Sequence, residues 1–196
     1  MQELKLVSPI APSVNHYCGV RAIIKNGKPM TMMYKKPEAV KYQKKFAEYV
    51  KQQAKEQNWV MSENRFQHYY MDCVFYFDRI DMDANNCFKC LADAITDAEC
   101  VWIDDTQLCE RVQGIFYDAE NPRIEITITP VLYTGIFDSA SRLESFENNC
   151  IGCTRYKRNC SILRKAKEGR IQKEITGIDE QYRCEKFTAI KAEIKN

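Results

Sequence analysis

Three aspartates within six residues, Asp78, Asp81 and Asp83, stand directly before a segment with the apolar spacing of a helix. Two more, Asp104 and Asp105, follow that segment. Carboxylates this close together repel one another unless a cation lies between them, and hard oxygen ligands suit magnesium or manganese. Such an ion can polarise a phosphoryl oxygen or lower the pKa of a bound water so that the water attacks. The acidic residues therefore indicate a metal site that does chemistry on a phosphate.

The segment between the acidic groups carries a lysine on its polar face. Its apolar residues recur at i, i+3, i+4 and i+7, namely Phe88, Leu91, Ala92 and Ile95, which predicts a helix with one buried face. Asn86, Lys89 and Asp93 share the opposite face. Lys89 would there neutralise charge that builds up on a phosphate during attack. The plainer interpretation is that Asp83 or Asn85 caps the helix and the other acids are solvated.

The elements around this helix would bring the two acidic groups together. Residues 69–78 are rich in aromatic and β-branched side chains and short enough for a buried strand, and a second strand follows Asp104 and Asp105. A strand, helix, strand path of this length returns to the same edge of a sheet. The acidic residues at the two turns are therefore expected to converge.

The remaining patterns complete a compact body. The Asn-Gly pair at Asn26 and Gly27 predicts a hairpin, and residues 37–58 have the spacing of a long amphipathic helix that begins at Pro37. Residues 123–130 alternate as a half-exposed strand does. We therefore predict an α/β (α+β) fold, with a small mixed sheet and two main helices over residues 1–135.

These motifs resemble those of a known family. The stretch "DANNCFKCLADAI" followed by "WIDDTQL" is similar to the signature of RusA-type Holliday junction resolvases, in which an Asp-x-Asp-Asn group precedes a Lys-x-x-x-Asp-Ala-Leu helix and an Asp-Asp-x-Gln turn. The N-terminal "PSVNHYCGVR" resembles the family's opening motif, and "IEITITP" resembles its closing strand. The resemblance covers about residues 4–130, with several independently spaced motifs.

The resemblance implies a magnesium-dependent endonuclease that cuts four-way DNA junctions as a homodimer. Position by position, Lys89 matches the essential lysine and Asp93 matches the helix aspartate. Asp104 and Asp105 match the paired aspartates, of which the second is the expected metal ligand. Asp83 matches the first aspartate of the earlier pair.

The chain departs from the family at the second aspartate of that pair, where it has Asn85, with Asn86 matching the family asparagine. Either the loop is shifted by two residues, so that Asp81 and Asp83 supply both carboxylates, or the site lacks one ligand and cuts poorly. We favour the shift because "DMD" itself reproduces the Asp-x-Asp spacing. The expected catalytic residues are then Asp81, Asp83, Lys89 and Asp105, with magnesium (or manganese) on the three aspartates. Asn85, Asn86, Asp93 and Asp104 are expected to support them.

Residues 136–196 have a different composition, which suggests a small helical, cysteine-rich appendage. Four of the chain's ten cysteines, Cys150, Cys153, Cys160 and Cys184, lie there among polar residues. The Cys-x-x-Cys spacing lets a chain wrap around a tetrahedral metal, so structural zinc is expected. An iron–sulfur cluster on the same ligands is the less favoured alternative, and four unligated thiols are the plain one.

The appendage is also basic between residues 155 and 173, although the chain as a whole carries a net charge of only +2. Such a run suits phosphate binding, whereas its plain interpretation is a solvated helix face over residues 161–174. The expected DNA-binding residues are Arg155, Lys157, Arg158, Arg164, Lys165, Lys167 and Arg170.

The sequence thus favours a structure-specific endodeoxyribonuclease of recombination and repair. The alternative is a non-catalytic DNA-binding or zinc-stapled interaction protein that keeps the resolvase fold, and Asn85 together with the basic appendage supports it. No apolar run approaches the roughly 20 residues of a membrane span, and the N-terminus lacks the pattern of a signal peptide. We therefore expect a cytoplasmic protein with no membrane partner.

Overall fold

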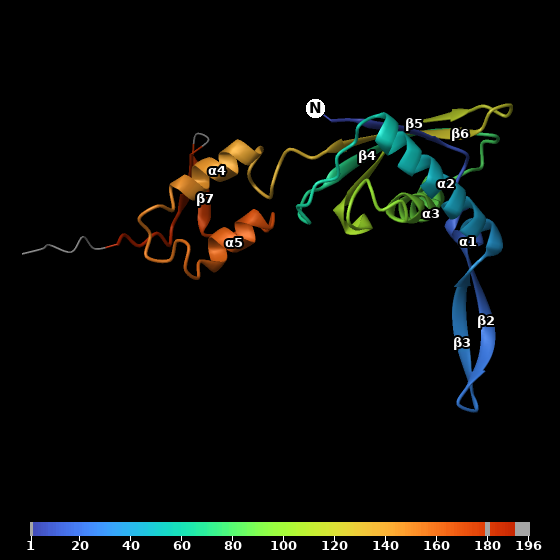
Figure 1. Ribbon diagram of the computed structural model, residues 1–196, viewed down its shortest axis with the longest axis horizontal. Coiled ribbons are helices and arrows are strands. Elements are labelled where there is room, and N and C mark those ends of the chain that lie inside the picture. The colour runs from blue at the N-terminus through green and yellow to red at the C-terminus, as the bar shows by residue number, and fades with distance from the viewer. Residues whose placement is uncertain (1, 179–180, 191–196) are drawn as a thin grey trace, which may run out of the picture. The chain divides into compact units, whose positions relative to one another are not determined.

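The computed structural model describes residues 2–178 and 181–190 of the 196-residue chain. The chain divides into two compact units, residues 1–131 and 132–196, and each is described by itself (Figure 1). Among the described residues, none of the helices combines the length and the apolar character that crossing a bilayer requires.

Unit 1 is built on a four-stranded mixed sheet. The strands β1 (Leu4–Ser8), β6 (Arg123–Pro130), β4 (Tyr69–Phe77) and β5 (Leu108–Tyr117) lie in that order. β6 runs antiparallel to β1 and to β4, whereas β4 and β5 are parallel. Helix α3 (Asn85–Thr96) connects the two parallel strands, so the predicted strand, helix, strand path is confirmed. The α/β (α+β) class with a mixed sheet is confirmed as well.

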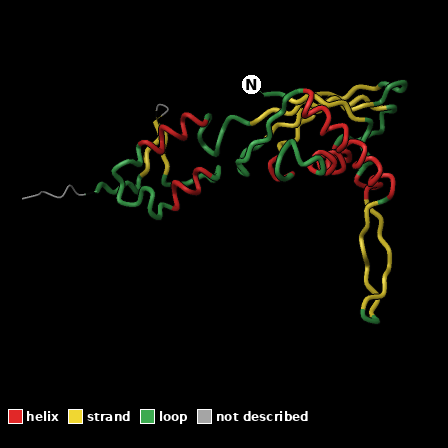
Figure 2. The backbone as a smooth tube through the Cα atoms, in the orientation of Figure 1, coloured by secondary structure: helices red, strands yellow, loops and turns green. Residues whose placement is uncertain are grey.

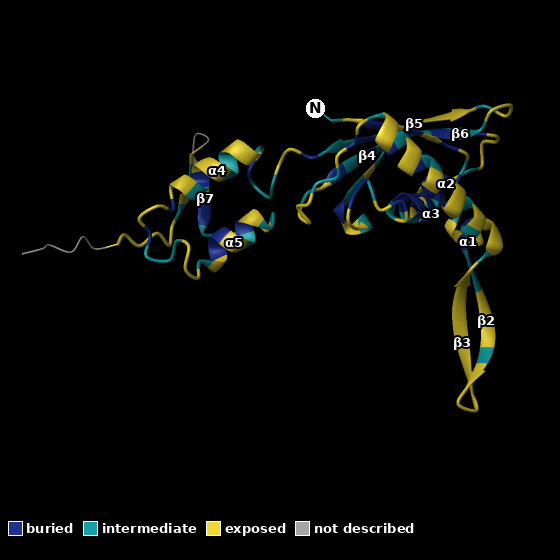
Figure 3. Cartoon of the chain, viewed as in Figure 1, coloured by how far each residue is buried: buried dark blue, intermediate teal, exposed yellow. Residues whose placement is uncertain are grey.

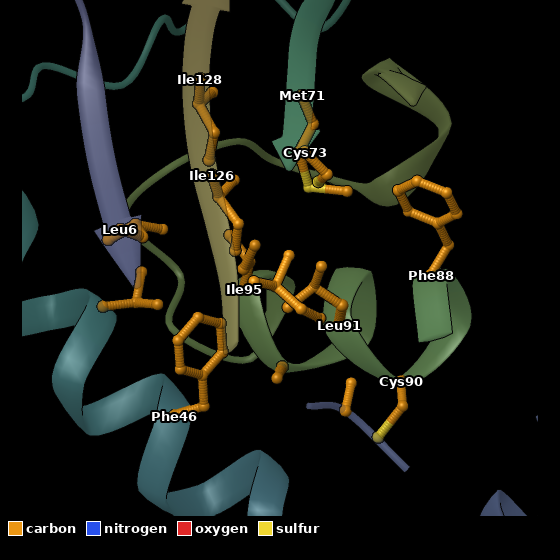
Figure 4. Packing of buried hydrophobic residues seen from close by; sticks show 14 of the residues in the cluster. Leu6, Phe46, Met71, Cys73, Phe88, Cys90, Leu91, Ile95, Ile126 and Ile128 are labelled. Atoms are coloured by element: carbon orange, nitrogen blue, oxygen red, sulfur yellow. The ribbon is translucent and has the colours of Figure 1, made fainter. Parts of the chain in front are cut away.

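One face of the sheet carries the core. Alternate residues of β4 from Tyr69 to Phe77 are at most 1% exposed, because a strand turns every second side chain to the same face. That face is covered by α3 and by α2 (Pro37–Glu56). Figure 4 shows Phe46 of α2 and Leu91 of α3 pointing toward the isoleucines of β6. The packing fixes α3, and with it the polar side chains on the opposite face of the helix.

A hairpin projects from the body of unit 1. The short helix α1 (Val14–Tyr17) leads into β2 (Cys18–Lys25), which forms a two-stranded sheet with β3 (Lys28–Lys35) (Figure 2). Asn26 and Gly27 form the turn with φ of 55° and 72°, the left-handed values that a tight hairpin needs, so the Asn-Gly prediction is confirmed. Every residue of β3 is exposed (Figure 3).

Unit 2 contains two short helices and a small hairpin. Its elements are α4 (Ala140–Asn148), α5 (Ser161–Lys167), β7 (Ile175–Ile178) and β8 (Gln181–Cys184). The helix expected over residues 161–174 is present but ends seven residues early. It ends there because Gly169 adopts a φ of 76°, which is incompatible with a continued right-handed helix.

Candidate active site

Helix α3 places Lys89 between two carboxylates. Its Nζ lies 2.7 Å from Oδ1 of Asp93, one helical turn away, and 3.0 Å from Oδ2 of Asp105. The side chain of Lys89 is 53% exposed, so the ammonium remains accessible from solvent. The hydrogen bonds to Asp93 and Asp105 raise the pKa of Lys89. The sequence motifs on the helix and on the following turn therefore meet at one cation.

Asp93 is held by a second set of polar side chains that comes from the N-terminal third of the chain. The hydroxyl of Tyr17 donates to Oδ2 of Asp93 and accepts from Nε2 of Gln43 at 3.0 Å. Nζ of Lys35 lies 3.4 Å from the same Asp93 oxygen. Burial raises the pKa of Asp93, but the hydrogen bonds from Lys89 and Tyr17 outweigh burial and leave the pKa lowered. Asp93 is thus a charged anchor that fixes Lys89.

The turn before β5 is a capped 3-10 helix, η1 (Asp105–Gln107). Oδ1 of Asp104 accepts from the backbone N–H of Thr106 at 2.9 Å and from its hydroxyl at 2.6 Å. Gln107 is buried, accepts from the backbone N–H of Ile103 at 2.8 Å and donates to the carbonyl of Gln67 at 2.7 Å. Asp104 and Gln107 therefore shape the turn, and Asp105 is the carboxylate that the turn presents to Lys89.

Glu110 on β5 is a further carboxylate at this site, which the sequence motifs do not indicate. It lies opposite Met71 of β4 in the parallel register, and Met71 belongs to the face that α3 covers. Desolvation of the Glu110 carboxyl and the negative charge of Asp105 raise its pKa, and the charge of Lys89 lowers it. Only the register of β5 against β4, which the sequence does not reveal, could have brought Glu110 into consideration.

Asp83 and Asp81 are placed differently. Asp83 lies at the start of α3, where Oδ1 accepts from the backbone N–H of Asn85 at 2.9 Å and Oδ2 accepts from Nδ2 of Asn86 at 3.2 Å. Asn86 and Lys89 are three residues apart and so share a face of the helix. Asp81 is exposed and pairs with Nε of Arg79 at 2.9 Å. The carboxylate of Asp83 thus bonds to the first turn of the helix, although the cap position is occupied by Ala84, and it is linked through Asn86 to the face that carries Lys89.

The structure therefore joins Lys89, Asp93 and Asp105 directly, and the charge of Asp105 acts on Glu110. Within the described part of the chain, no three His, Cys, Asp or Glu side chains form a ready-made set of metal ligands. The donors at the site are nevertheless carboxylate and amide oxygens, which are the ligands that magnesium and manganese prefer. The chemistry of this donor set fits a hard divalent cation.

In unit 2 the basic residues are partly neutralised. Glu168 lies between Arg164, at 3.3 Å, and Arg170, at 3.1 Å. Lys167 pairs with Glu147 of α4 at 2.5 Å. The sequence pattern of the run did not reveal the pairing of Lys167, because Glu147 lies outside the run. The four cysteines of this unit, in contrast, line a single cavity.

Comparison with known proteins bears on unit 1. No curated protein matches the chain. Residues 9–129, well over half of the chain, match the family model described as Endodeoxyribonuclease RusA. The match spans the segment from the loop before Tyr17 to the end of β6, and so includes Lys89, Asp93 and Asp105. This chain belongs to the RusA endodeoxyribonuclease family, whose activity is directed at DNA junctions.

Proposed function

We propose that the protein is a magnesium-dependent endodeoxyribonuclease that resolves four-way (Holliday) junctions in recombination and repair. The observation that carries the proposal is the Lys89 ammonium between Asp93 and Asp105, inside the segment that matches the family. In this proposal residues 1–135 are the nuclease domain and residues 136–196 are an extension of it.

Asp81, Asp83 and Asp105 would hold the magnesium or manganese ion, with Asn85, Asn86 and Asp104 in support. When bound, such an ion supplies positive charge at the scissile phosphate and lowers the pKa of a nucleophilic water. The carboxylate of Asp105 is 36% exposed, so it can turn from Lys89 toward an arriving ion without leaving the turn that η1 fixes.

Lys89 would bind the scissile phosphate. Its raised pKa keeps the side chain protonated at neutral and alkaline pH, so it presents a full charge to the phosphate oxygens. Asp93 positions the ammonium, because Tyr17 and Gln43 restrain the carboxylate from the other side. The ammonium and the carboxylate are then already oriented in the folded protein, so the reaction does not have to overcome the entropy loss of orienting them.

The basic residues of unit 2 would contact the DNA backbone. The candidates are Arg155, Lys157, Arg158, Arg164, Lys165, Lys167 and Arg170. Because each phosphate contact releases counterions, junction affinity should fall steeply with salt. Glu168 and Glu147 compete for three of the cations, so Arg158 and Lys165 are expected to contribute more than Arg164, Arg170 or Lys167.

A homodimer follows from the twofold symmetry of the substrate, since paired cuts on two strands call for two active sites. One exposed surface supports this proposal. Val20, Ile24 and Met33 lie on the same face of the β2–β3 hairpin and are 65%, 80% and 67% exposed. From Val20 to Ile24 this face carries no charge, which suits a second copy of the chain better than DNA. A Met33→Glu variant should then be a monomer by light scattering, and a dimeric variant would contradict this contact.

A second candidate function is that of a junction-binding protein that no longer cuts, or of a zinc-stapled interaction protein on the same fold. Asn85 favours it, because an amide is a neutral and weaker ligand than the carboxylate that the family has there. The pairing of Asp81 with Arg79 favours it too, since Arg79 competes with a metal ion for this carboxylate.

The test is an assay on a synthetic four-way junction and on a linear duplex with the same arm sequences, with and without magnesium. The proposal expects paired nicks in the junction only when magnesium is present. Tight junction binding without any cutting, over a range of magnesium and manganese concentrations, would contradict it and favour the second candidate.

A further inference from the structure

Four cysteines that are distant in the sequence meet in unit 2. Cys150 follows α4, Cys153 lies in the next turn, Cys160 directly precedes α5, and Cys184 is the last residue of β8. All four line one cavity of about 10 Å³, the size of a water molecule or a single ion. The structure contains no disulfide between any of them.

The turn that joins the first two thiols is tight. The backbone N–H of Cys153 donates to the carbonyl of Cys150 at 3.0 Å, and Gly152 between them adopts a φ of 85°. Both cysteines are buried, with exposed fractions of 7% and 8%. The pair is thus held over the cavity by backbone geometry that favours glycine at position 152.

Backbone N–H groups approach two of the four sulfurs. Backbone N–H groups of Thr188 and Arg155 lower the pKa of the Cys153 thiol. Sγ of Cys160 accepts from the backbone N–H of Leu163 at 3.5 Å. Amide donors of this kind suit a sulfur that is bound to a metal ion.

The pKa of the Cys150 thiol is shifted in the opposite direction from that of Cys153. Burial raises the pKa of its thiol to about 11, and the charges of Cys160, Cys184 and Cys153 each contribute. Because all four cysteines line one cavity, thiolates there would repel one another, and a cation among them would remove this cost.

We propose that Cys150, Cys153, Cys160 and Cys184 bind one zinc ion as thiolates and that this ion holds unit 2 together. The described residues hold no preformed group of three ligands, so the thiols must rotate about their Cα–Cβ bonds when zinc binds. Each thiol that binds gives its proton to the buffer, and neither zinc nor sulfur changes oxidation state. Soft sulfur ligands in a tetrahedral set select zinc over magnesium. The proposal is independent of the nuclease activity of unit 1.

Unit 2 is small enough to need such an ion. Its buried apolar cluster consists of Phe137, Phe146, Cys150, Ile162, Leu163, Ala166 and Ile175. A core of this size supplies little stability, and metal binding to a site that exists only in the folded state adds directly to the free energy of unfolding. Because Cys150 and Cys153 lie in the turn after α4, Cys160 lies at the start of α5 and Cys184 at the end of β8, one ion would cross-link these three elements.

The experiment measures metal on the full-length chain. Protein purified after growth with added zinc should contain about one zinc ion per chain, as measured by inductively coupled plasma mass spectrometry. Replacement of the ion by cobalt should give the intense absorption of thiolate-to-cobalt charge transfer. Cys153→Ser and Cys184→Ser should each lose most of the zinc, whereas Cys109→Ser, which removes a thiol of unit 1, should keep it.

A second measurement uses the unaltered protein, so the proposal can still be tested if the cysteine variants do not fold. Titration with a mercurial reagent should release zinc to a coloured chelator at about four thiols per ion. Absence of zinc, zinc that survives the Cys153 and Cys184 substitutions, iron with acid-labile sulfide, or disulfides among these cysteines would each overturn the proposal. Junction cleavage, measured on the same preparations, tests the nuclease proposal separately.

Discussion

Lys89 Nζ lies 3.0 Å from Oδ2 of Asp105, and this ion pair joins the middle of α3 to the turn that starts β5. The two residues are sixteen positions apart in the chain. The contact exists because β4 and β5 are parallel neighbours, so that the crossover helix α3 and the turn meet at one edge of the sheet. The pair therefore links the lysine of the helix motif to the acidic turn that follows the helix.

Asp105→Asn should abolish most of the cleavage while leaving the fold intact. The amide keeps the size of the side chain and its partial exposure but removes the negative charge offered to a metal ion. We expect junction cleavage at saturating magnesium to fall by at least about 100-fold. Asp97→Asn on the exposed end of α3 is the matched control. Thermal unfolding should show the same midpoint for both variants.

The two-residue shift of the metal ligands predicts that Asp81→Asn and Asp83→Asn are both severely impaired. Each would remove one of the two carboxylates that the loop supplies. Full activity of Asp81→Asn would eliminate the shift. In that case Asn85→Asp should raise the cleavage rate above that of the unaltered chain, since it would restore the carboxylate that the family carries.

Tyr17→Phe should slow cleavage without weakening junction binding. The hydroxyl of Tyr17 donates to Asp93, which positions Lys89, and its loss is worth ~1 kcal/mol, or about a 5-fold slower step. Tyr49→Phe removes a hydroxyl that accepts from the backbone of Val7 at 3.2 Å and lies outside this network. Single-turnover cleavage rates of the two variants show whether the loss of a tyrosine hydroxyl slows cleavage only when that hydroxyl contacts Asp93. Equal rates would show that Tyr17 does not position the site.

The Asp72–Arg111 pair should make stability depend on pH. Nε of Arg111 donates to Oδ1 of Asp72 at 2.7 Å, and Nη2 donates to Oδ2 at 2.6 Å. Burial raises the pKa of Asp72, but the bonds from Arg111 and Gln113 outweigh burial and leave the pKa lowered. The pair therefore stabilises the fold above the unfolded pKa of about 3.9, and this contribution is lost as pH falls through the folded pKa.

Asp72→Asn should accordingly cost about 1–2 kcal/mol at pH 7, and the difference from the unaltered chain should shrink below about pH 4. Urea unfolding at several pH values measures it. Glu120→Gln, which removes a carboxylate from an exposed turn, should show no such loss. A difference for Asp72→Asn that stays constant down to acidic pH would contradict the assignment to its carboxylate.

Much of unit 1 could be predicted because local signals agreed with the tertiary fold. The apolar spacing from Phe88 to Ile95 predicted α3, and the helix buries that face. The Asn26-Gly27 pair predicted the hairpin turn. The polar face of α3 placed Lys89 and Asp93 together for the same geometric reason, since residues four apart on a helix are neighbours.

What the sequence could not show depends on contacts between distant elements. Glu110 reaches the site through the register of β5 against β4, and a one-residue slip would turn it to the other face. The partner of Lys167 is Glu147 on another helix, so the basic run is less cationic than its composition indicates. The sequence overestimates the length of α5 because the residues after Lys167 continue the charged composition, whereas the φ of Gly169 ends the helix.

The most direct test of the central claim is single-turnover cleavage of a four-way junction in magnesium by Lys89→Ala. The chain should bind the junction nearly as well as before, because Lys89 is one cation among many, yet cut it at least about 100-fold more slowly. Lys45→Ala, which removes an exposed charge from α2, should cut at the unaltered rate. If Lys89→Ala cuts as fast as Lys45→Ala, the site around Lys89 and Asp105 is not the catalytic centre.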